Sequence, residues 1–253
     1  MSNIIISVKD LHKKYGEFEA VKGISFDVYE GEVFGLLGPN GAGKSSTLEI
    51  IETLRDKTSG TVIVDGIDLD KDPEAIKKII GVQLQTSGYY PGLNLTELID
   101  LFSGLYNRSV NTKELLGLVN LQDKAKAKFK ELSGGQKQRF SIATTLINKP
   151  KIIFLDEPTT GLDPQARRNL WDLIKNIRSQ GATVIITTHY MDEAEQLCDR
   201  VAIMDEGKII ALASPDKLID ELVATGFERP KVTKAANLED VFINLTGKDF
   251  RED

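Results

Sequence analysis

Eight consecutive residues near the N-terminal end of the chain have the pattern of a phosphate-binding loop. Glycines let successive backbone N–H groups turn toward one anion, and the start of the helix predicted over residues 44–54 adds partial positive charge. In this motif the lysine reaches the β- and γ-phosphates, and the final hydroxyl binds Mg²⁺. The loop therefore predicts a bound nucleoside triphosphate, rather than a glycine-rich turn without a ligand. Its residues are Gly38, Pro39, Asn40, Gly41, Ala42, Gly43, Lys44 and Ser45.

Two adjacent carboxylates, Asp156 and Glu157, end an apolar stretch later in the chain. Residues 152–155 are all apolar and predict a buried strand that should lie beside the phosphate loop. Mg²⁺ keeps several waters in its octahedral shell, so Asp156 is expected to hold the ion or one of these waters. Glu157 projects differently and is expected to polarise an attacking water. The alternative is a solvated turn, which the apolar run and the following Pro158 disfavour.

A third segment begins a predicted helix in an unusual way. The side chains of Ser133 and Gln136 can cap the first turn reciprocally, but Gly134 and Gly135 stand just inside it. Each glycine costs a helix about 1 kcal/mol relative to alanine. Close approach of the backbone to an anion at the helix N-terminus explains the glycines, whereas capping alone does not.

The elements that position these segments fall into three groups. Short alternating strands with turn signals at Glu30-Gly31 and Asp65-Gly66 predict an antiparallel sheet beside the phosphate loop. Residues 86–148 are almost free of strand signal and carry helix caps at Asn94, Asn111 and Ser133. From residue 151, apolar strands alternate with amphipathic helices, which is typical of a parallel sheet. The predicted strands are residues 4–8, 24–28, 32–37, 61–64, 81–84, 152–156, 183–187, 201–204 and 209–212.

The three chemical segments, in this order, resemble the ATP-binding subunit of ATP-binding-cassette (ABC) transporters. The stretches 131–164 and 238–247 further resemble the bacterial drug-exporter class, the daunorubicin-resistance type, and residues 238–245 are predicted to form a helix. One departure is Thr144, where an arginine is common in that family. The implied fold class is α/β: a P-loop NTPase (RecA-like) core with an antiparallel β subdomain and a helical subdomain, the ABC ATPase fold. The expected organisation is an ATPase domain over residues 1–220, with the helical subdomain at about 86–148, and a C-terminal extension over 221–253.

The resemblance assigns roles to individual residues. It implies that Tyr15 stacks on adenine, against the alternative of a half-buried surface tyrosine. It also implies that Gln85 touches Mg²⁺ and that His189 contacts the γ-phosphate. The expected catalytic residues are then Glu157, His189 and Lys44, and the expected metal ligands are Ser45, Gln85 and Asp156. The expected nucleotide-binding residues are Tyr15, Gly38, Pro39, Asn40, Gly41, Ala42, Gly43, Lys44, Ser45, Ser46, Gln85, Ser133, Gly134, Gly135, Gln136 and Asp156.

The resemblance also implies ATP and Mg²⁺ as cofactors and two kinds of partner. Residues 133–136 would contact ATP held by a second ATPase subunit, most simply an identical one, so that two copies sandwich two ATP molecules. Integral membrane permease subunits would supply the pore, because the longest apolar run here, 209–213, is far shorter than the ~20 residues of a spanning helix. The segment containing Tyr89, Tyr90, Pro91 and Leu93 would dock on them, or else pack on its own subdomain. The exported molecule would be a drug, a lipid or another small hydrophobic compound.

Composition bears on the rival functions. A length of 253 residues with 41% hydrophobic and 28% charged residues is typical of a soluble globular protein. The net charge of -6 gives no basic footprint for nucleic acid, so no such partner is expected. This disfavours a soluble ABC ATPase acting on ribosomes or DNA, as does the single cassette without a heptad run. One cysteine, Cys198, and the absence of a signal-peptide pattern indicate a cytoplasmic protein, held at the inner face of the membrane by its permease.

Overall fold

The computed structural model of the protein describes residues 3–83 and 88–227. Residues 1–218 form one compact unit and residues 219–253 form a second. The first unit contains both β-sheets described below. Within the described ranges, no helix has both the length and the apolar character needed to cross a membrane.

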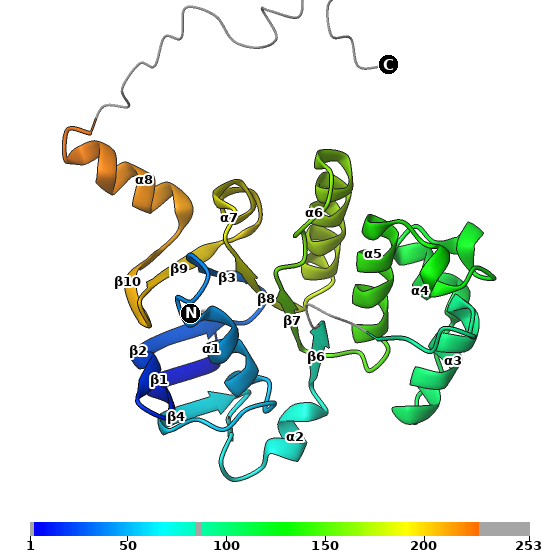
Figure 1. The fold of residues 1–253 in the computed structure, drawn as a ribbon, viewed down its shortest axis with the longest axis horizontal. Coiled ribbons are helices and arrows are strands. Elements are labelled where there is room, and N and C mark those ends of the chain that lie inside the picture. The colour runs from blue at the N-terminus through cyan, green and yellow to red at the C-terminus, as the bar shows by residue number, and fades with distance from the viewer. Residues whose placement is uncertain (1–2, 84–87, 228–253) are drawn as a thin grey trace, which may run out of the picture. The chain divides into compact units, whose positions relative to one another are not determined.

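The described strands form two sheets (Figure 1). The first is antiparallel, with the order β2-β1-β4-β5. It contains β1 (Ile4–Tyr15), β2 (Phe18–Tyr29), β4 (Ser59–Val64) and β5 (Ile67–Asp68). The second has the order β10-β9-β3-β8-β7-β6 and is parallel except for β10. It contains β3 (Val33–Leu37), β6 (Ile80–Gln83), β7 (Ile152–Asp156), β8 (Thr183–Thr188), β9 (Arg200–Asp205) and β10 (Lys208–Ala213).

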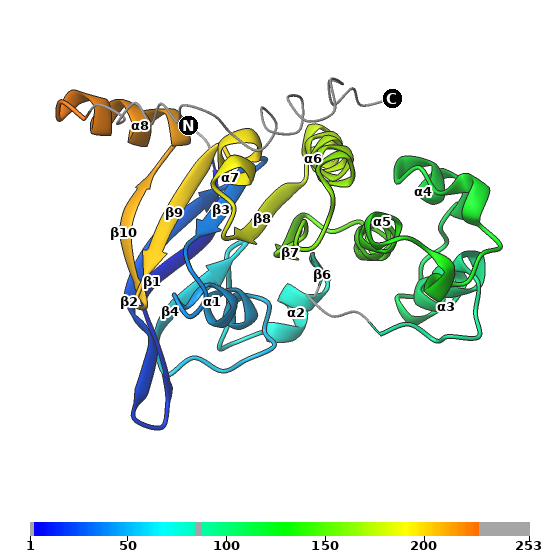
Figure 2. The same cartoon turned by 45° about the horizontal axis from the view of Figure 1, so that its top comes forward.

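The α-helices are α1 (Lys44–Ile51), α2 (Pro73–Lys77), α3 (Leu95–Leu105), α4 (Thr112–Leu118), α5 (Gly134–Thr145), α6 (Pro164–Ser179), α7 (Met191–Leu197) and α8 (Pro215–Ala224). Helix α1 packs on one face of the parallel sheet, and α5, α6 and α7 pack on the other. Two short 3₁₀ turns are η1 (Gln122–Lys124) and η2 (Phe129–Glu131). In both views, α3 and α4 lie beyond α5 as seen from the sheet (Figures 1 and 2).

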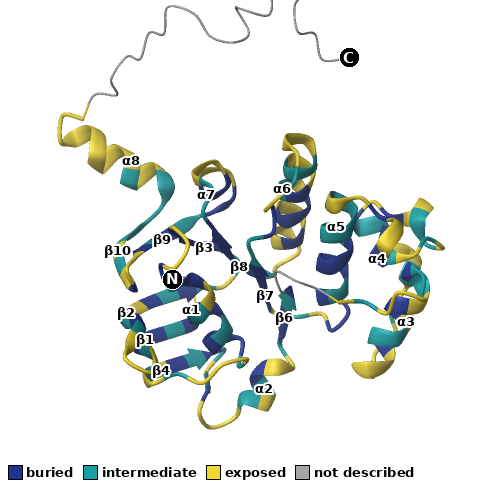
Figure 3. Ribbon diagram, in the orientation of Figure 1, coloured by how far each residue is buried: buried dark blue, intermediate teal, exposed yellow. Residues whose placement is uncertain are grey.

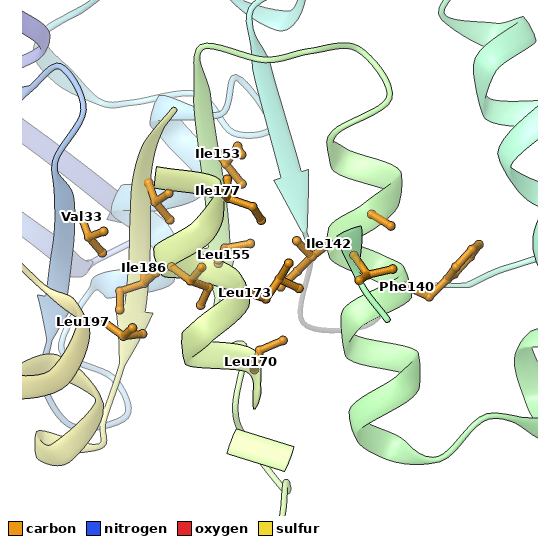
Figure 4. Close-up of a cluster of buried hydrophobic side chains, with 14 of the residues drawn as sticks. Val33, Phe140, Ile142, Ile153, Leu155, Leu170, Leu173, Ile177, Ile186 and Leu197 are labelled. Atoms are coloured by element: carbon orange, nitrogen blue, oxygen red, sulfur yellow. The ribbon is translucent and has the colours of Figure 1, made fainter. Parts of the chain in front are cut away.

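Alternation of side chains along the strands explains the layers. On β7, Ile152 and Phe154 pack into a cluster with α1 and the antiparallel sheet, while Ile153 and Leu155 pack into a cluster with α5, α6 and α7. Successive side chains of a strand point to opposite faces, so a strand buried on both faces is apolar throughout. The buried residues are therefore continuous along the central strands β3, β7 and β8, whereas β10 at the edge has none (Figure 3). Figure 4 shows Ile153 and Leu155 facing Leu173 and Ile177 of α6.

The predicted elements are largely confirmed, with three differences. The strands β1 and β2 form one long hairpin: β1 continues to Tyr15, past the predicted end at residue 8, and β2 begins at Phe18, before the predicted start at residue 24. The helix predicted over residues 44–54 ends at Ile51, because Thr53 takes a left-handed backbone conformation with φ 63°. A short helix, α2, was not predicted, although its Asp-Pro start is a helix signal; Asp72 accepts from the N–H of Ala75. The predicted caps of α3, α4 and α5 are confirmed, and the helix predicted over 238–245 lies outside the described residues.

Candidate nucleotide-binding site

The phosphate-binding loop joins β3 to α1, as the sequence predicts. Gly41 and Gly43 have φ of 83° and 98°, a conformation open to glycine and strained for residues with a side chain. A Cβ at Gly43 would also lie 2.5 Å from the carbonyl oxygen of Ala20 on β2. The loop thus packs against β2 of the antiparallel sheet, and α1 begins directly after its last glycine.

Lys44, the first residue of α1, has an ammonium group held inside this loop. Its side chain is 4% exposed, and Nζ donates to the carbonyl oxygens of Gly38 at 2.8 Å and Pro39 at 3.0 Å. Glu157 Oε1 lies 3.8 Å from the same nitrogen. Burial lowers the pKa of Lys44, and the carboxylates of Glu157 and Asp156 raise it in part. A cation so held is placed to meet a phosphate anion at the loop.

Asp156 ends β7 beside Ser45 and is anchored from the neighbouring strand. Ser45 Oγ donates to Asp156 Oδ1 at 3.5 Å, and Thr187 Oγ1 on β8 donates to the same oxygen at 2.5 Å. Burial raises the pKa of Asp156, while the bond from Thr187 lowers it. A hydroxyl and a carboxylate converging in this way are oxygen ligands of the kind that Mg²⁺ prefers, so these two side chains fit the expected metal.

Glu157 lies at the centre of the site, in a strained backbone conformation. Its φ is 46°, which is uncommon for a residue other than glycine. One carboxylate oxygen faces Lys44, and the other accepts from Thr160 Oγ1 at 3.2 Å and lies 3.3 Å from His189 Nδ1. His189 follows β8 directly, and its ring packs on that of Tyr190 with centroids 4.1 Å apart. The structure therefore brings together Lys44, Glu157 and His189, three residues far apart in the sequence.

An open cavity of about 550 Å³ extends from this cluster to the tip of the β1–β2 hairpin. Tyr15 lines its far end, 39% exposed, and its hydroxyl is 3.1 Å from Ser46 Oγ. Lys13 and Arg55 approach the Tyr15 ring at 5.0 and 5.4 Å. Tyr15 thus has the position that stacking on a base would need, with the phosphate loop at the other end of the same cavity. The lining residues are Tyr15, Phe18, Ala20, Asn40, Gly41, Gly43, Lys44, Ser45, Ser46, Glu49, Arg55 and Glu157.

Residues 133–136 lie at the start of α5 and do not line this cavity. The capping box is present: Ser133 N–H donates to Gln136 Oε1 at 3.0 Å, and Gln136 N–H donates to Ser133 Oγ at 3.3 Å. The two glycines differ in their surroundings. A Cβ at Gly135 would lie 2.9 Å from the Cβ of Ala166 on α6, whereas one at Gly134 would meet only Leu162 Cδ2, at 3.7 Å. Tight packing against α6 therefore gives Gly135 a reason besides close approach to an anion, whereas packing within one chain gives Gly134 none.

The segment after Gln85, which was expected to dock on the permease, contains one packed and one exposed tyrosine. Gln85 itself lies outside the described residues. Tyr89 is packed inside the helical region, with its ring against Phe102, Phe129 and Phe140, and its hydroxyl is 3.1 Å from Thr144 Oγ1. Tyr90 is 67% exposed. Tyr89 therefore packs on its own subdomain, the alternative left open by the sequence, and Thr144 has a hydrogen-bond partner of its own.

One buried acid near the site has no predicted role. Glu52, at the end of α1, is 2% exposed, and its Oε1 has no hydrogen-bond partner within residues 3–83 and 88–227. Burial raises its pKa from 4.5 to about 8, helped by the negative charges of Asp156 and Glu49. The folded chain therefore holds this proton more tightly than the unfolded chain does. The resulting stability is complete below pH 4.5 and is lost as the pH rises through about 8.

Replacing Glu52 with glutamine is expected to flatten this pH dependence, because glutamine stays neutral. From 1.36 kcal/mol per pKa unit over the rise from 4.5 to about 8, ionising Glu52 in the folded state costs about 5 kcal/mol, or a melting-temperature difference of roughly 10 °C or more. The two melting temperatures should be close at pH 5 and diverge up to pH 9, with the variant higher. Thermal unfolding across that range tests this, with E74Q on exposed α2 as the control. Parallel curves for wild type and E52Q would contradict it.

Sequence reasoning missed two residues that hold the site together. Thr187 bonds to Asp156 and accepts from the N–H of Glu157 at 3.0 Å. Thr160 bonds to the carboxylate of Glu157. Thr187 lies within the apolar strand β8, where threonine is an ordinary residue, so its type does not indicate a role in the site. Only the register of β7 against β8, which pairs Asp156 with Thr187, reveals the contact.

Comparisons with known proteins agree with this geometry. The family model described as ABC transporter matches residues 21–160. The chain is 40% identical over 304 residues to the Nod factor export ATP-binding protein I of Burkholderia orbicola (strain AU 1054), with 100% of each chain covered. It is 39% identical over 223 residues to the linearmycin resistance ATP-binding protein LnrL of Bacillus subtilis (strain 168), covering 86% of this chain and 72% of that one.

A solved structure supports the expected fold and activity. A dimeric, post-hydrolysis state of the ATP-binding cassette MJ0796, bound to ADP and phosphate, superposes with a TM-score of 0.73. It is 31% identical in sequence and covers 83% of this chain and 98% of its own. The expected ABC ATPase fold, with its antiparallel and parallel sheets, is thereby confirmed. The phosphate loop, the paired acids and the matching relatives together show that this chain is an ATPase of the ABC transporter family.

Proposed function

We propose that this chain is the motor subunit of an ABC exporter of drugs, lipids or other small hydrophobic molecules. It works with a second copy of itself and a separate membrane permease, on the cytoplasmic face of the cell membrane. The relatives named for Nod factor export and linearmycin resistance support the exporter class. The observation that carries the catalytic part is the approach of Lys44 and His189 to the carboxylate of Glu157, which lines the cavity beside Lys44.

ATP lies along this cavity, with its base at Tyr15 and its phosphates in the loop. The backbone N–H groups of the loop and the ammonium of Lys44 bind the β- and γ-phosphates. The carbonyl bonds that now hold Lys44 keep its ammonium near that place before ATP arrives. Ser45, Asp156 and Gln85 would hold Mg²⁺, which when bound would spread the negative charge that develops on the phosphates.

Glu157 directs the chemical step. Its carboxylate orients a water in line with the γ-phosphorus and accepts a proton as the new P–O bond forms. The bond from the γ-phosphorus to the oxygen bridging to the β-phosphate breaks, which releases phosphate and leaves ADP. His189, beside Glu157, contacts the γ-phosphate and holds the attack geometry. Tyr190 supports its ring from the other side.

A second copy completes the site through residues 133–136. These residues do not line the cavity of their own chain, although the helix start is a ready anion site. The backbone at Gly134 is open in one chain, which is what close approach to a partner's phosphate requires. ATP binding then favours the closed pair, and loss of the γ-phosphate opens it.

We further propose that residues 1–220 form the ATPase domain, with its helical subdomain at about 86–148, and that residues 221–253 form an extension. The exposed Tyr90 of the helical subdomain is a candidate contact with the permease. Its neighbour Tyr89 packs on Phe129 of η2, which comes just before residues 133–136 in the chain. Through this packing, a movement at the permease contact reaches the start of α5.

Purified protein is expected to hydrolyse ATP only when Mg²⁺ is present, because phosphate charge and water attack both depend on the ion. Chelation of Mg²⁺ should abolish turnover, and its return should restore it. Ribosomes or DNA should leave the rate unchanged, whereas co-reconstitution with the permease should raise it. Phosphate release measured under each of these conditions provides the test. Strong stimulation by nucleic acid would favour the soluble ribosome or DNA class instead.

The two glycines of α5 should respond differently to alanine. Gly135→Ala forces α6 to move, and overpacking of about 1–3 kcal/mol lowers the melting temperature by roughly 3–10 °C. Gly134→Ala has room within one chain and gains the higher helix preference of alanine, so its melting temperature should stay the same or rise by a few degrees. ATP-dependent pairing and turnover should nevertheless weaken. Thermal unfolding and phosphate release on both variants test this. Full activity of Gly134→Ala would remove the proposed contact with the partner's ATP.

A further inference from the structure

We propose that Thr187 is a positioning residue that sets both acids of the site at once. The inference rests on the roles proposed above for Asp156 and Glu157. Thr187 is fully buried, at 0% exposure, on the strand next to β7. Its hydroxyl donates to Asp156 Oδ1 at 2.5 Å and accepts from the backbone N–H of Glu157 at 3.0 Å. One oxygen atom therefore links two residues with different tasks.

The contact with Glu157 comes where the regular strand pairing stops. The parallel register ends at Asp156 opposite Thr187, so the N–H of Glu157 lies beyond the β7–β8 ladder. Glu157 also has a left-handed backbone, with φ 46°. Such a conformation costs roughly 1–2 kcal/mol in a residue other than glycine and persists only where its surroundings hold it. The Thr187 oxygen supplies a partner for the N–H in this conformation, which aims the Glu157 side chain between Lys44 and His189.

The contact with Asp156 fixes the rotation of its carboxylate. Thr187 and Ser45 both donate to Oδ1, from opposite sides of the site: one from β8 and one from α1. A charged acceptor held by two hydroxyl donors has a defined orientation, and hydrogen bonds to a charged group are stronger than neutral ones. Loss of the Thr187 hydroxyl would leave the carboxylate tied only through the longer contact, at 3.5 Å.

The same strand offers a matched control. Thr183, at the other end of β8, is also 0% exposed, and its hydroxyl accepts from the N–H of Gly31 at 2.9 Å. Thr183 therefore shares with Thr187 its residue type, its burial and a bond from a backbone N–H. Thr183 does not contact Asp156 or Glu157. If Thr187 had only a structural role, its replacement should therefore have the same effect as replacement of Thr183.

The test compares Thr187→Val with Thr183→Val in the full chain, with kcat, KM for ATP and Mg²⁺ dependence measured on folded protein. Misplacement of a reacting group by about 1 Å can cost about 10²-fold, so T187V should lose on the order of 10²-fold in kcat. KM for ATP should stay within about threefold, because the adenine and phosphate contacts lie elsewhere. T187V should also need more Mg²⁺ for half-maximal rate. T183V should keep the kcat and the Mg²⁺ dependence of the wild type, even if its melting temperature falls as far as that of T187V.

Serine retains the hydroxyl, so Thr187→Ser should recover most of the turnover that T187V loses. T187S and T187A differ by one oxygen atom and supply the same comparison if T187V does not fold. Turnover of T187V or T187A close to that of T187S would overturn the inference, and so would an equal loss of kcat in T183V. An inactive wild-type chain would instead contradict the proposed function on which the inference rests.

Discussion

Replacing Glu157 with glutamine is expected to lower ATP turnover by about 10²–10⁴-fold, the range that general bases contribute. Glutamine has nearly the same shape but cannot accept a proton from water. The Thr160 and Lys44 neighbours remain, so ATP should still bind and the loss should appear in kcat rather than in KM. Single-turnover phosphate release with excess enzyme measures the chemical step directly.

Glu206→Gln is the matched control for this variant. Glu206 also has a left-handed backbone, with φ 45°, but lies in the turn between β9 and β10 and is not among the residues that line the cavity. It should turn over at the wild-type rate. Turnover of Glu157→Gln within a few-fold of wild type would remove Glu157 as the residue that directs the water.

Lys44→Met is expected to weaken ATP binding by about 100-fold or more, which at 1.4 kcal/mol per tenfold is about 3 kcal/mol. The loss follows because the ammonium is the one buried cation that lines the phosphate end of the cavity among the described residues. Methionine fills much of the same volume without charge. Since burial already lowers the pKa of Lys44, removing its charge should leave the melting temperature of the nucleotide-free chain nearly unchanged.

Calorimetric titration of ATP into Lys44→Met, beside thermal unfolding, separates binding from folding. Lys151→Met serves as the control, since Lys151 pairs with Asp65 at 2.6 Å on the exposed surface and should leave ATP affinity unchanged. An unaltered affinity in Lys44→Met would contradict the assignment of Lys44 to the phosphates. A collapse of the fold in that variant would show that the carbonyl bonds of Lys44 are structural.

Contiguous motifs were the most predictable part of the site. The loop 38–45 contains its own turn chemistry, and the apolar run before Asp156 identifies a doubly buried strand without any other information. Both follow from local backbone physics, so one sequence suffices. The caps at Asn94 and Ser133 were predictable for the same reason, because each helix start is defined by residues three apart.

Contacts between distant segments were not predictable in this way. Thr187 gains its partners through the register of β7 against β8, which no local pattern specifies. Gly135 is required by the approach of α6, and Tyr89 is buried because three phenylalanines from separate elements meet there. In each case the residue type was visible, but its environment depends on tertiary packing.

The central claim is that two copies of this chain close on ATP, each contributing a phosphate loop to one site and residues 133–136 to the other. The mass of the Glu157→Gln chain in solution, measured by sedimentation, tests this most directly. With ATP and Mg²⁺ the mass should double, while with ADP, or without nucleotide, it should remain that of one chain. A mass that stays at one chain with ATP bound and uncleaved would contradict the account.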